Sequence, residues 1–118
     1  MKTLLLVAHG SRREASNDEV RTLARALAAK VADRYDRVEA AFLELATPSI
    51  PDAIDAAIAS GAGEVVLCPY FLSAGRHVSE DIPAIVAERR AAHPRASIRI
   101  TPYLGQHDRL AEVLAQLV

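Results

Sequence analysis

The feature that most constrains this chain is a regular alternation of strand-like and helix-like segments. Apolar runs typical of strands occur at 3–8, 38–45, 64–72 and 97–103. Each is followed by a stretch with apolar residues at three- and four-residue steps, the period of an amphipathic helix. Repeated strand–helix units predict an α/β fold with a four-stranded parallel sheet and helices on both of its faces.

Start and stop signals give the expected limits of the helices. Ser16 and Glu19 have the spacing of a capping box for the first helix. Thr47 followed by Pro48 predicts the N-cap and the first residue of the second helix, which we expect to end at Gly61. The third and fourth helices are expected at 79–92 and 110–117.

Length and charge limit the domain organisation and the partners. A chain of 118 residues is long enough for one hydrophobic core and too short for two, so we expect one domain over 1–118. Its 14 basic and 15 acidic side chains give a net charge of -1, which predicts neither a nucleic-acid nor a membrane partner. The apolar stretch at 4–8 is too short for a signal sequence or a membrane span. Cys68, the single cysteine, cannot form an internal disulfide, which favours a reducing, cytoplasmic location.

Chemically active side chains follow the predicted strands. His9 comes directly after the first strand, Glu44 lies at the end of the second, and His77 lies on the loop after the third. The carboxyl ends of parallel strands meet at one edge of a sheet, where ligands bind, so we expect these side chains to converge. Two imidazoles and a carboxylate suit late first-row divalent metals. The lack of a four-ligand cysteine and histidine pattern favours a transient metal site over a structural one.

Each of these side chains also has a structural interpretation. A lone histidine is often only a hydrogen-bonding member of the fold, and His77 also fits the entry of a helix. Glu44 fits a metal ligand, a proton acceptor or a cap of a neighbouring helix equally well. The strand-end position of His9, together with the presence of a second histidine at the same edge, favours the functional interpretation.

Three arginines lie near the same edge of the predicted sheet. Arg12, Arg13 and Arg76 carry planar donor groups that match the carboxylates or phosphates of a ligand. The alternative is that they pair with acidic residues of the chain itself. We expect at least one such pairing, with Glu14, Glu80 or Asp81.

The remaining histidines and glycines favour structural roles. His93 lies at the exit of the third helix, at the opposite edge, where a cation suits a helix C-terminus. His107 lies at the functional edge, but its place just before the last helix favours a structural role. Gly61 and Gly63 lie between a helix and a strand, on the wrong side for a phosphate-binding loop. A nucleotide site is therefore not expected.

Several short motifs occur in a fixed order at the expected strand ends. They are Leu6-Val7-Ala8-His9-Gly10-Ser11-Arg12, Phe42-Leu43-Glu44 with Pro48-Ser49-Ile50, Pro69-Tyr70-Phe71-Leu72, Gly75-Arg76-His77 and Asp81-Ile82-Pro83. Together they span the chain, which resembles the short sirohydrochlorin chelatase family, small cobalt or iron chelatases of cobalamin and siroheme synthesis. The resemblance implies a class II chelatase fold of which this chain is one half. It also implies a homodimer that rebuilds the two-lobed cleft.

The resemblance further implies an activity and a set of site residues. The activity is ATP-independent insertion of a divalent metal, with cobalt, iron and nickel as candidates, into sirohydrochlorin. His9 and His77 match the family's metal-handling histidines and Glu44 matches its acidic position, so these three are the expected catalytic residues. The metal is a substrate, and no permanently bound cofactor is expected. The expected substrate-binding residues are Ser11, Arg12, Arg13, Tyr70, Phe71, Leu72, Ser73, Ala74, Gly75 and Arg76.

Two other functions stay open at this point. The same residues fit a non-catalytic carrier that binds the metal or the tetrapyrrole without turnover. A less favoured alternative is phosphoryl transfer through His9, with Arg76 and His77 completing a phosphate pocket. No further phosphate-binding motif supports that alternative.

Overall fold

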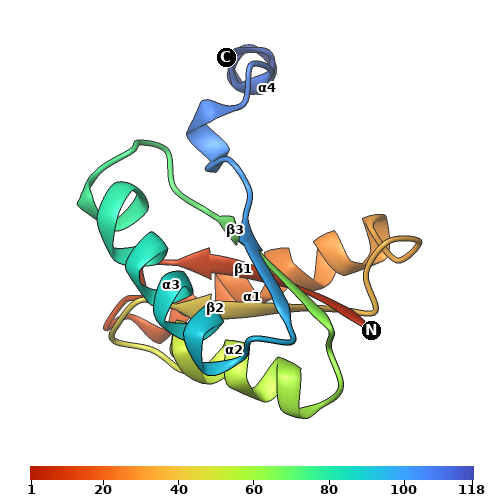
Figure 1. Cartoon of the computed structure of the whole chain (residues 1–118). Coiled ribbons are helices and arrows are strands. Elements are labelled where there is room, and N and C mark those ends of the chain that lie inside the picture. The colour runs from red at the N-terminus through yellow and green to blue at the C-terminus, as the bar shows by residue number, and fades with distance from the viewer.

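A single parallel sheet forms the centre of the molecule. The computed structural model describes residues 1–118 and orders the four strands β2-β1-β3-β4 (Figure 1). All neighbouring strands are parallel, and β1 pairs with β2 on one side and β3 on the other. The strands are β1 (Lys2–Ala8), β2 (Arg37–Phe42), β3 (Glu64–Pro69) and β4 (Ser97–Ile100). The predicted fold class is confirmed.

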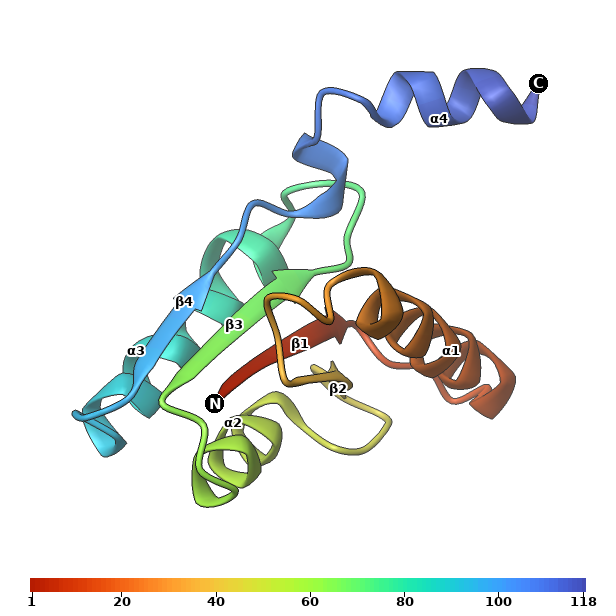
Figure 2. The same cartoon turned by 90° about the vertical axis from the view of Figure 1, so that its right-hand side faces the viewer.

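Helices cover the sheet on both faces. They are α1 (Glu14–Lys30), α2 (Ile50–Ala59), α3 (Ile82–Ala92) and α4 (Leu110–Leu117), with a π turn at His77–Asp81 and a 3-10 turn at Leu104–Gln106. Figure 2 shows α1 on one side of the sheet and α2 and α3 on the other. Each of the helices is too short or too polar to span a bilayer.

The central strand β1 explains why both faces need a cover. Its side chains alternate between the two faces, so that Leu5 and Val7 join the core beneath α2 and α3, whereas Leu6 and Ala8 pack beneath α1. All four are at most 6% exposed. Burying one leucine or valine side chain contributes about 1.5–3 kcal/mol relative to leaving it in water. The continuous apolar run in the sequence therefore reflects burial on both sides.

Three strands end earlier than their apolar runs predict. Strand β2 ends at Phe42, whose N–H bonds the carbonyl of Pro48 at 2.9 Å, although the next two N–H groups still bond Ala8 and His9. After β3, the N–H of Tyr70 still bonds Val7, but the chain then turns into the loop before α3. After β4, Pro102 has no N–H to continue the ladder.

The predicted starts of α1 and α2 are wrong. Helix α1 begins at Glu14 with Arg13 as its N-cap, so Ser16 lies inside the helix and no capping box forms. The N-cap of α2 is Ser49, whose side chain accepts a hydrogen bond from the N–H of Asp52 at 3.2 Å. Ser49 is held beside the end of β2 by an isolated bridge to Phe42. This tertiary contact moves the helix start beyond Thr47 and Pro48.

Helix α4 forms where it is predicted but does not pack on the sheet. None of its residues is buried, and Figure 1 shows it standing clear of the other helices. Val113, Leu114 and Leu117 are 52%, 55% and 77% exposed. The apolar stripe of this helix is therefore left in water within one chain.

An ion-pair cluster joins α2 to α3 at the edge away from the strand carboxyl ends. Asp55 accepts a hydrogen bond from His93 at 2.8 Å and two from Arg89 at 3.0 and 3.1 Å. The bond from His93, and after it the bond from Arg89, hold the pKa of Asp55 below its ordinary value despite the opposing effect of burial. His93, the C-cap of α3, thus has the structural environment that its position predicts.

Replacing Asp55 with Asn should lower stability at neutral pH by up to about 1 kcal/mol, the range for partly exposed ion pairs. Because the folded pKa is lowered, the stabilisation is present above the unfolded-state pKa and is lost as the pH falls through the folded value. Thermal unfolding from pH 7 down to pH 2.5 should show the Asp55→Asn and wild-type curves converging in acid. Asp33→Asn, the same change in an exposed turn, should track wild type throughout; a constant gap for Asp55→Asn would contradict the prediction.

Candidate active site

The pairing of β1 with β2 extends beyond the strands and brings Glu44 beside His9. The N–H of Leu43 bonds the carbonyl of Ala8, and the N–H of Glu44 bonds the carbonyl of His9, both at 3.0 Å. Gly10, with φ of 95°, permits this close approach, because a Cβ on it would lie 1.8 Å from the carbonyl oxygen of Glu44. The residue after His9 therefore has to be glycine.

The structure brings the two predicted histidines into direct contact. Their ring centroids are 4.8 Å apart, with an edge-to-face angle of 64°. Nε2 of His9 lies 3.1 Å from Oε1 of Glu44. Nδ1 of His77, in the turn before α3, lies 2.8 Å from Oδ2 of Asp81. Two histidine–carboxylate pairs thus stand side by side at the carboxyl edge of the sheet.

The hydrogen-bond partners place a proton on Nδ1 of both imidazoles and leave the two Nε2 atoms in different surroundings. Asp81 accepts from Nδ1 of His77, and Nε2 of that ring has no partner in the chain. Nδ1 of His9 donates to the carbonyl of Gly10 at 3.0 Å, because a carbonyl can only accept. Nε2 of His9 then faces the Glu44 carboxylate, and that contact is favourable only with a proton between them.

A buried amide holds the loop that follows His9. Asn17, in the first turns of α1, is 1% exposed; its Oδ1 accepts from the N–H of Ser11 at 2.9 Å. Its Nδ2 donates to the carbonyl of Ser11 at 2.8 Å. Ser11 in turn accepts from the N–H of Arg13 through its hydroxyl. The loop before α1 is therefore fixed by one side chain that the sequence analysis did not single out.

The three arginines differ in their pairing. Arg76 pairs with Glu80 at 3.5 Å, which confirms one of the expected alternative pairings. Glu14 is taken by Arg21 of α1, a pairing that the sequence analysis did not consider, and these contacts lower the pKa of Glu14. Arg12 and Arg13 form no salt bridge and are exposed, so their guanidinium groups are available to a ligand.

The loop between β3 and α3 carries the other predicted substrate-binding residues. Tyr70, Phe71 and Leu72 line a small apolar hollow together with Leu104. The ring centroid of Phe71 lies 6.5 Å from that of His77, which places this hollow next to the histidines. Ser73, Ala74 and Gly75 continue the loop and are exposed.

The weaker candidates of the sequence analysis have structural surroundings. His107 accepts a hydrogen bond from the N–H of Arg109 through Nδ1 at 3.0 Å, just before α4 begins. Gly61, with φ of 106°, turns the chain between α2 and β3 at the amino end of the sheet.

The donor set is not arranged as a ready-made metal site. No three histidine, cysteine, aspartate or glutamate side chains are placed to hold one ion together. The sequence analysis missed two side chains of this arrangement, Asp81 as the partner of His77 and Asn17 as the anchor of the loop. The spacing of four residues between His77 and Asp81 is a signal that could have found the first of them.

Comparison with known proteins fits this arrangement. Residues 3–118 match the model of the protein family described as CbiX. The chain belongs to the CbiX family. It is 39% identical to "Sirohydrochlorin ferrochelatase, chloroplastic" of Arabidopsis thaliana over 94% of this chain and 48% of that protein. It is 30% identical to the sirohydrochlorin cobaltochelatase of Sulfurisphaera tokodaii over 100% of this chain and 92% of that protein.

CbiX-family proteins of different lengths therefore share this unit. The chain spans about half the length of the curated relatives it matches first, 48%, 58% and 59% of three of them. The sirohydrochlorin chelatase SirB of Bacillus subtilis, solved in complex with cobalt, superimposes with a TM-score of 0.85 at 25% identity. The superposition covers 98% of this chain and 48% of SirB. This agrees with the predicted correspondence to one half of a longer chelatase.

Replacing Asn17 with Ala should destabilise this CbiX-family chain by about 1–3 kcal/mol, because the N–H and carbonyl of Ser11 lose their buried partner. Denaturant unfolding measures the loss. The matched control is Asn17→Asp, which keeps the acceptor for the Ser11 N–H but cannot donate to its carbonyl, and which should also be less stable than wild type. Wild-type stability in the alanine variant would show that the amide does not anchor the loop.

Proposed function

We propose that this chain inserts a divalent metal into sirohydrochlorin without ATP, with cobalt and iron as the main candidate ions and nickel as a third. The observation that carries the proposal is the contact of the His9–Glu44 and His77–Asp81 pairs at the carboxyl edge of the sheet. The chelatase names of its relatives support it. In this proposal residues 1–118 act as one chelatase domain in a cytoplasmic homodimer, whose two copies form the walls of the cleft.

Metal insertion makes three demands on the residues of the site. The ion must be held while it sheds water, two pyrrole protons must leave, and the carboxylate groups of the macrocycle must be bound. In the proposal, the free lone pair on Nε2 of His77 binds the incoming ion, since neutral imidazole is a ligand for late first-row metals. Asp81 fixes that tautomer and the orientation of the ring.

The His9–Glu44 pair suits proton removal. When Glu44 is ionised and His9 is neutral, a lone pair on Nε2 faces a carboxylate oxygen 3.1 Å away, and the two repel. Uptake of one proton between these atoms turns the repulsion into a charge-assisted hydrogen bond. We therefore assign removal of a pyrrole proton to His9 and Glu44. The second proton passes to solvent or to Nε2 of His77 after the ion has left it.

The substrate-binding side chains divide into charged and apolar groups. Arg12 and Arg13, free of salt bridges, match the peripheral carboxylates of the macrocycle. Tyr70, Phe71 and Leu72 provide apolar surface for the face of the ring. Ser11 and the exposed backbone of residues 73–75 supply further hydrogen-bonding groups. Arg76 is a weaker candidate for binding the carboxylates than Arg12 and Arg13, because it already forms a salt bridge with Glu80.

The contacts of His9 favour this function over phosphoryl transfer. A histidine that accepts a phosphoryl group needs a free nitrogen facing the phosphate. Both ring nitrogens of His9 face oxygen acceptors, and the Glu44 carboxylate beside Nε2 would repel a phosphate.

The first test is metal insertion followed by absorbance, with purified protein, sirohydrochlorin and Co²⁺, Fe²⁺ or Ni²⁺ under anaerobic conditions. His9→Ala and His77→Ala should each reduce the rate to that of the reaction without protein. His93→Ala, the same truncation at the far edge, should keep turnover at temperatures well below its unfolding midpoint. Near-normal rates in both site variants would overturn the assignment, and binding of the tetrapyrrole without turnover by wild type would establish a carrier instead.

A second test separates the role of Asp81 from that of a structural residue. Asp81→Ala should weaken apparent metal affinity about 10–100-fold, the usual effect of losing the partner of a metal-binding histidine. Asp81→Asn, which can still accept from Nδ1, should recover part of the loss. Glu80→Ala, in the same turn but paired only with Arg76, is the control and should leave the KM for the metal unchanged. If all three variants had the wild-type KM for the metal, Asp81 would have no role in metal binding.

A further inference from the structure

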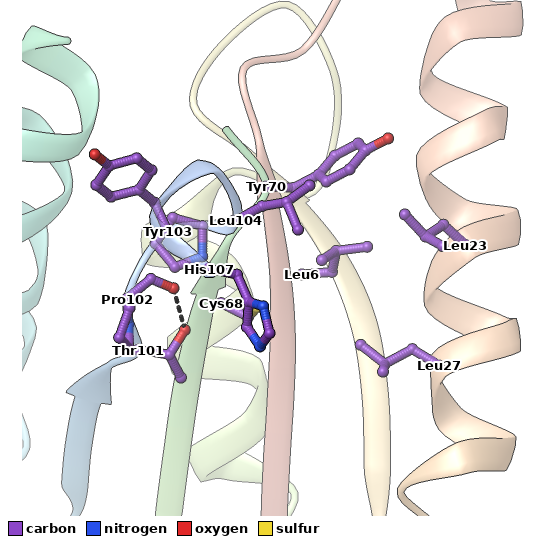
Figure 3. A pocket seen from close by; sticks show the side chains of 11 residues that line it. Leu6, Leu23, Leu27, Cys68, Tyr70, Thr101, Pro102, Tyr103, Leu104 and His107 are labelled. Atoms are coloured by element: carbon purple, nitrogen blue, oxygen red, sulfur yellow. Dashed lines mark hydrogen bonds between the residues drawn. The ribbon is translucent and has the colours of Figure 1, made fainter. Parts of the chain in front are cut away.

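An apolar groove lies open on the α1 side of the sheet, toward the carboxyl end of β3. It has a volume of about 590 Å³. Figure 3 shows Leu23 and Leu27 of α1 facing Cys68 of β3 across it, with His107 on the far side. Helix α1 packs against β2 and β1 and leaves this part of β3 and the segment after β4 without a helix above them. Because both faces of a parallel sheet are normally covered by helices, the groove marks a place where a covering helix is missing.

The same chain carries a helix that lacks a surface to cover. Leu110, Val113, Leu114 and Leu117 lie on one stripe of α4, and the last three are more than half exposed. Glu112 and Ala115 lie on the opposite side. No aspartate, glutamate, lysine or arginine lines the groove, and none lies on the apolar stripe of α4. The two surfaces therefore match in chemistry.

The segment before α4 directs the helix away from its own groove. The N–H of Gly105 bonds the carbonyl of Phe71 at 2.9 Å, which ties the 3-10 turn to the loop after β3. Gly105 sits so close to that loop that a Cβ on it would lie 1.8 Å from the carbonyl oxygen of Leu72. His107 then accepts from the N–H of Arg109. Figures 1 and 2 both show α4 leaving the body beyond this anchored turn.

We infer that α4 of one copy docks in the groove of a second copy, and that the second copy returns its α4 to the first. A reciprocal exchange of identical elements closes a twofold dimer and leaves neither surface uncovered. The net charge of -1 gives little repulsion between copies. The inference rests on the homodimer of the proposed function and names the element that builds it.

The single native cysteine provides a direct probe, because Cys68 lines the groove. Three variants place a second cysteine on the stripe, Val113→Cys, Leu114→Cys and Leu117→Cys, and mild oxidation tests which thiols meet. Exchange predicts a covalent dimer on a non-reducing gel for at least one of them, with no free thiol left. Ala115→Cys, on the opposite side of α4, is the matched control and should give no such dimer. Repeating each stripe variant with Cys68→Ser should abolish the dimer and so excludes a bond between two α4 helices.

Sedimentation gives an independent readout. Wild type should sediment at twice the chain mass of 12.7 kDa. Leu114→Glu should sediment at the mass of one chain, whereas Ala115→Glu, which adds the same charge to the other side, should stay dimeric. Circular dichroism confirms that both variants fold.

Three results would overturn the inference. They are a monomeric wild type, a disulfide within one chain, which would mean that α4 folds back on its own groove, and cross-linking of Ala115→Cys equal to that of the stripe variants. The metal-insertion assay is read separately. Metal insertion by a monomer would contradict the exchange of α4 and support the chelatase proposal. An exchanged dimer that does not insert metal would support the exchange and contradict the chelatase proposal.

Discussion

The site depends on one set of contacts, the hydrogen bonds that β1 makes to β2 and β3 on its two sides. Because all three strands run in the same direction, their carboxyl ends reach the same edge of the sheet. The ladder between β1 and β2 continues one residue past β1 and two residues past β2, and this extension sets His9 against Glu44. The loop after β3 leads into the π turn that carries His77. At Gly10 this backbone approach leaves no room for a side chain.

The two histidines are neighbours with different hydrogen-bond partners. His77 has one nitrogen on a carboxylate and the other free, whereas His9 has both nitrogens facing oxygen acceptors. An exchange of a metal ion for protons needs a ligand and a base at the same place. The difference between the two environments gives a physical basis for assigning one of these tasks to each ring.

The sequence contained enough information for the sheet and for the convergence of the site. Apolar runs separated by helical periods specify parallel strands, and the parallel direction alone places His9, Glu44 and His77 at one edge. The start of α1 was mispredicted because Ser16 and Glu19 have the right spacing but lie inside the helix. The start of α2 was mispredicted because a tertiary bridge from Phe42 to Ser49 places the N-cap at Ser49 and not at Thr47. Asn17 gives no local signal, since its role depends on burial. The amphipathic pattern of α4 shows that the helix has an apolar side without showing which surface covers it.

The exposure of the site has a consequence for the path of the protons. The side chains of His9 and Glu44 are 42% and 57% in contact with solvent, and those of His77 and Asp81 are each 43% exposed. In the proposed reaction, a proton that His9 takes from the macrocycle would reach bulk water in a single transfer. The fold would then need no internal chain of proton carriers, and the buffer would regenerate the base between turnovers.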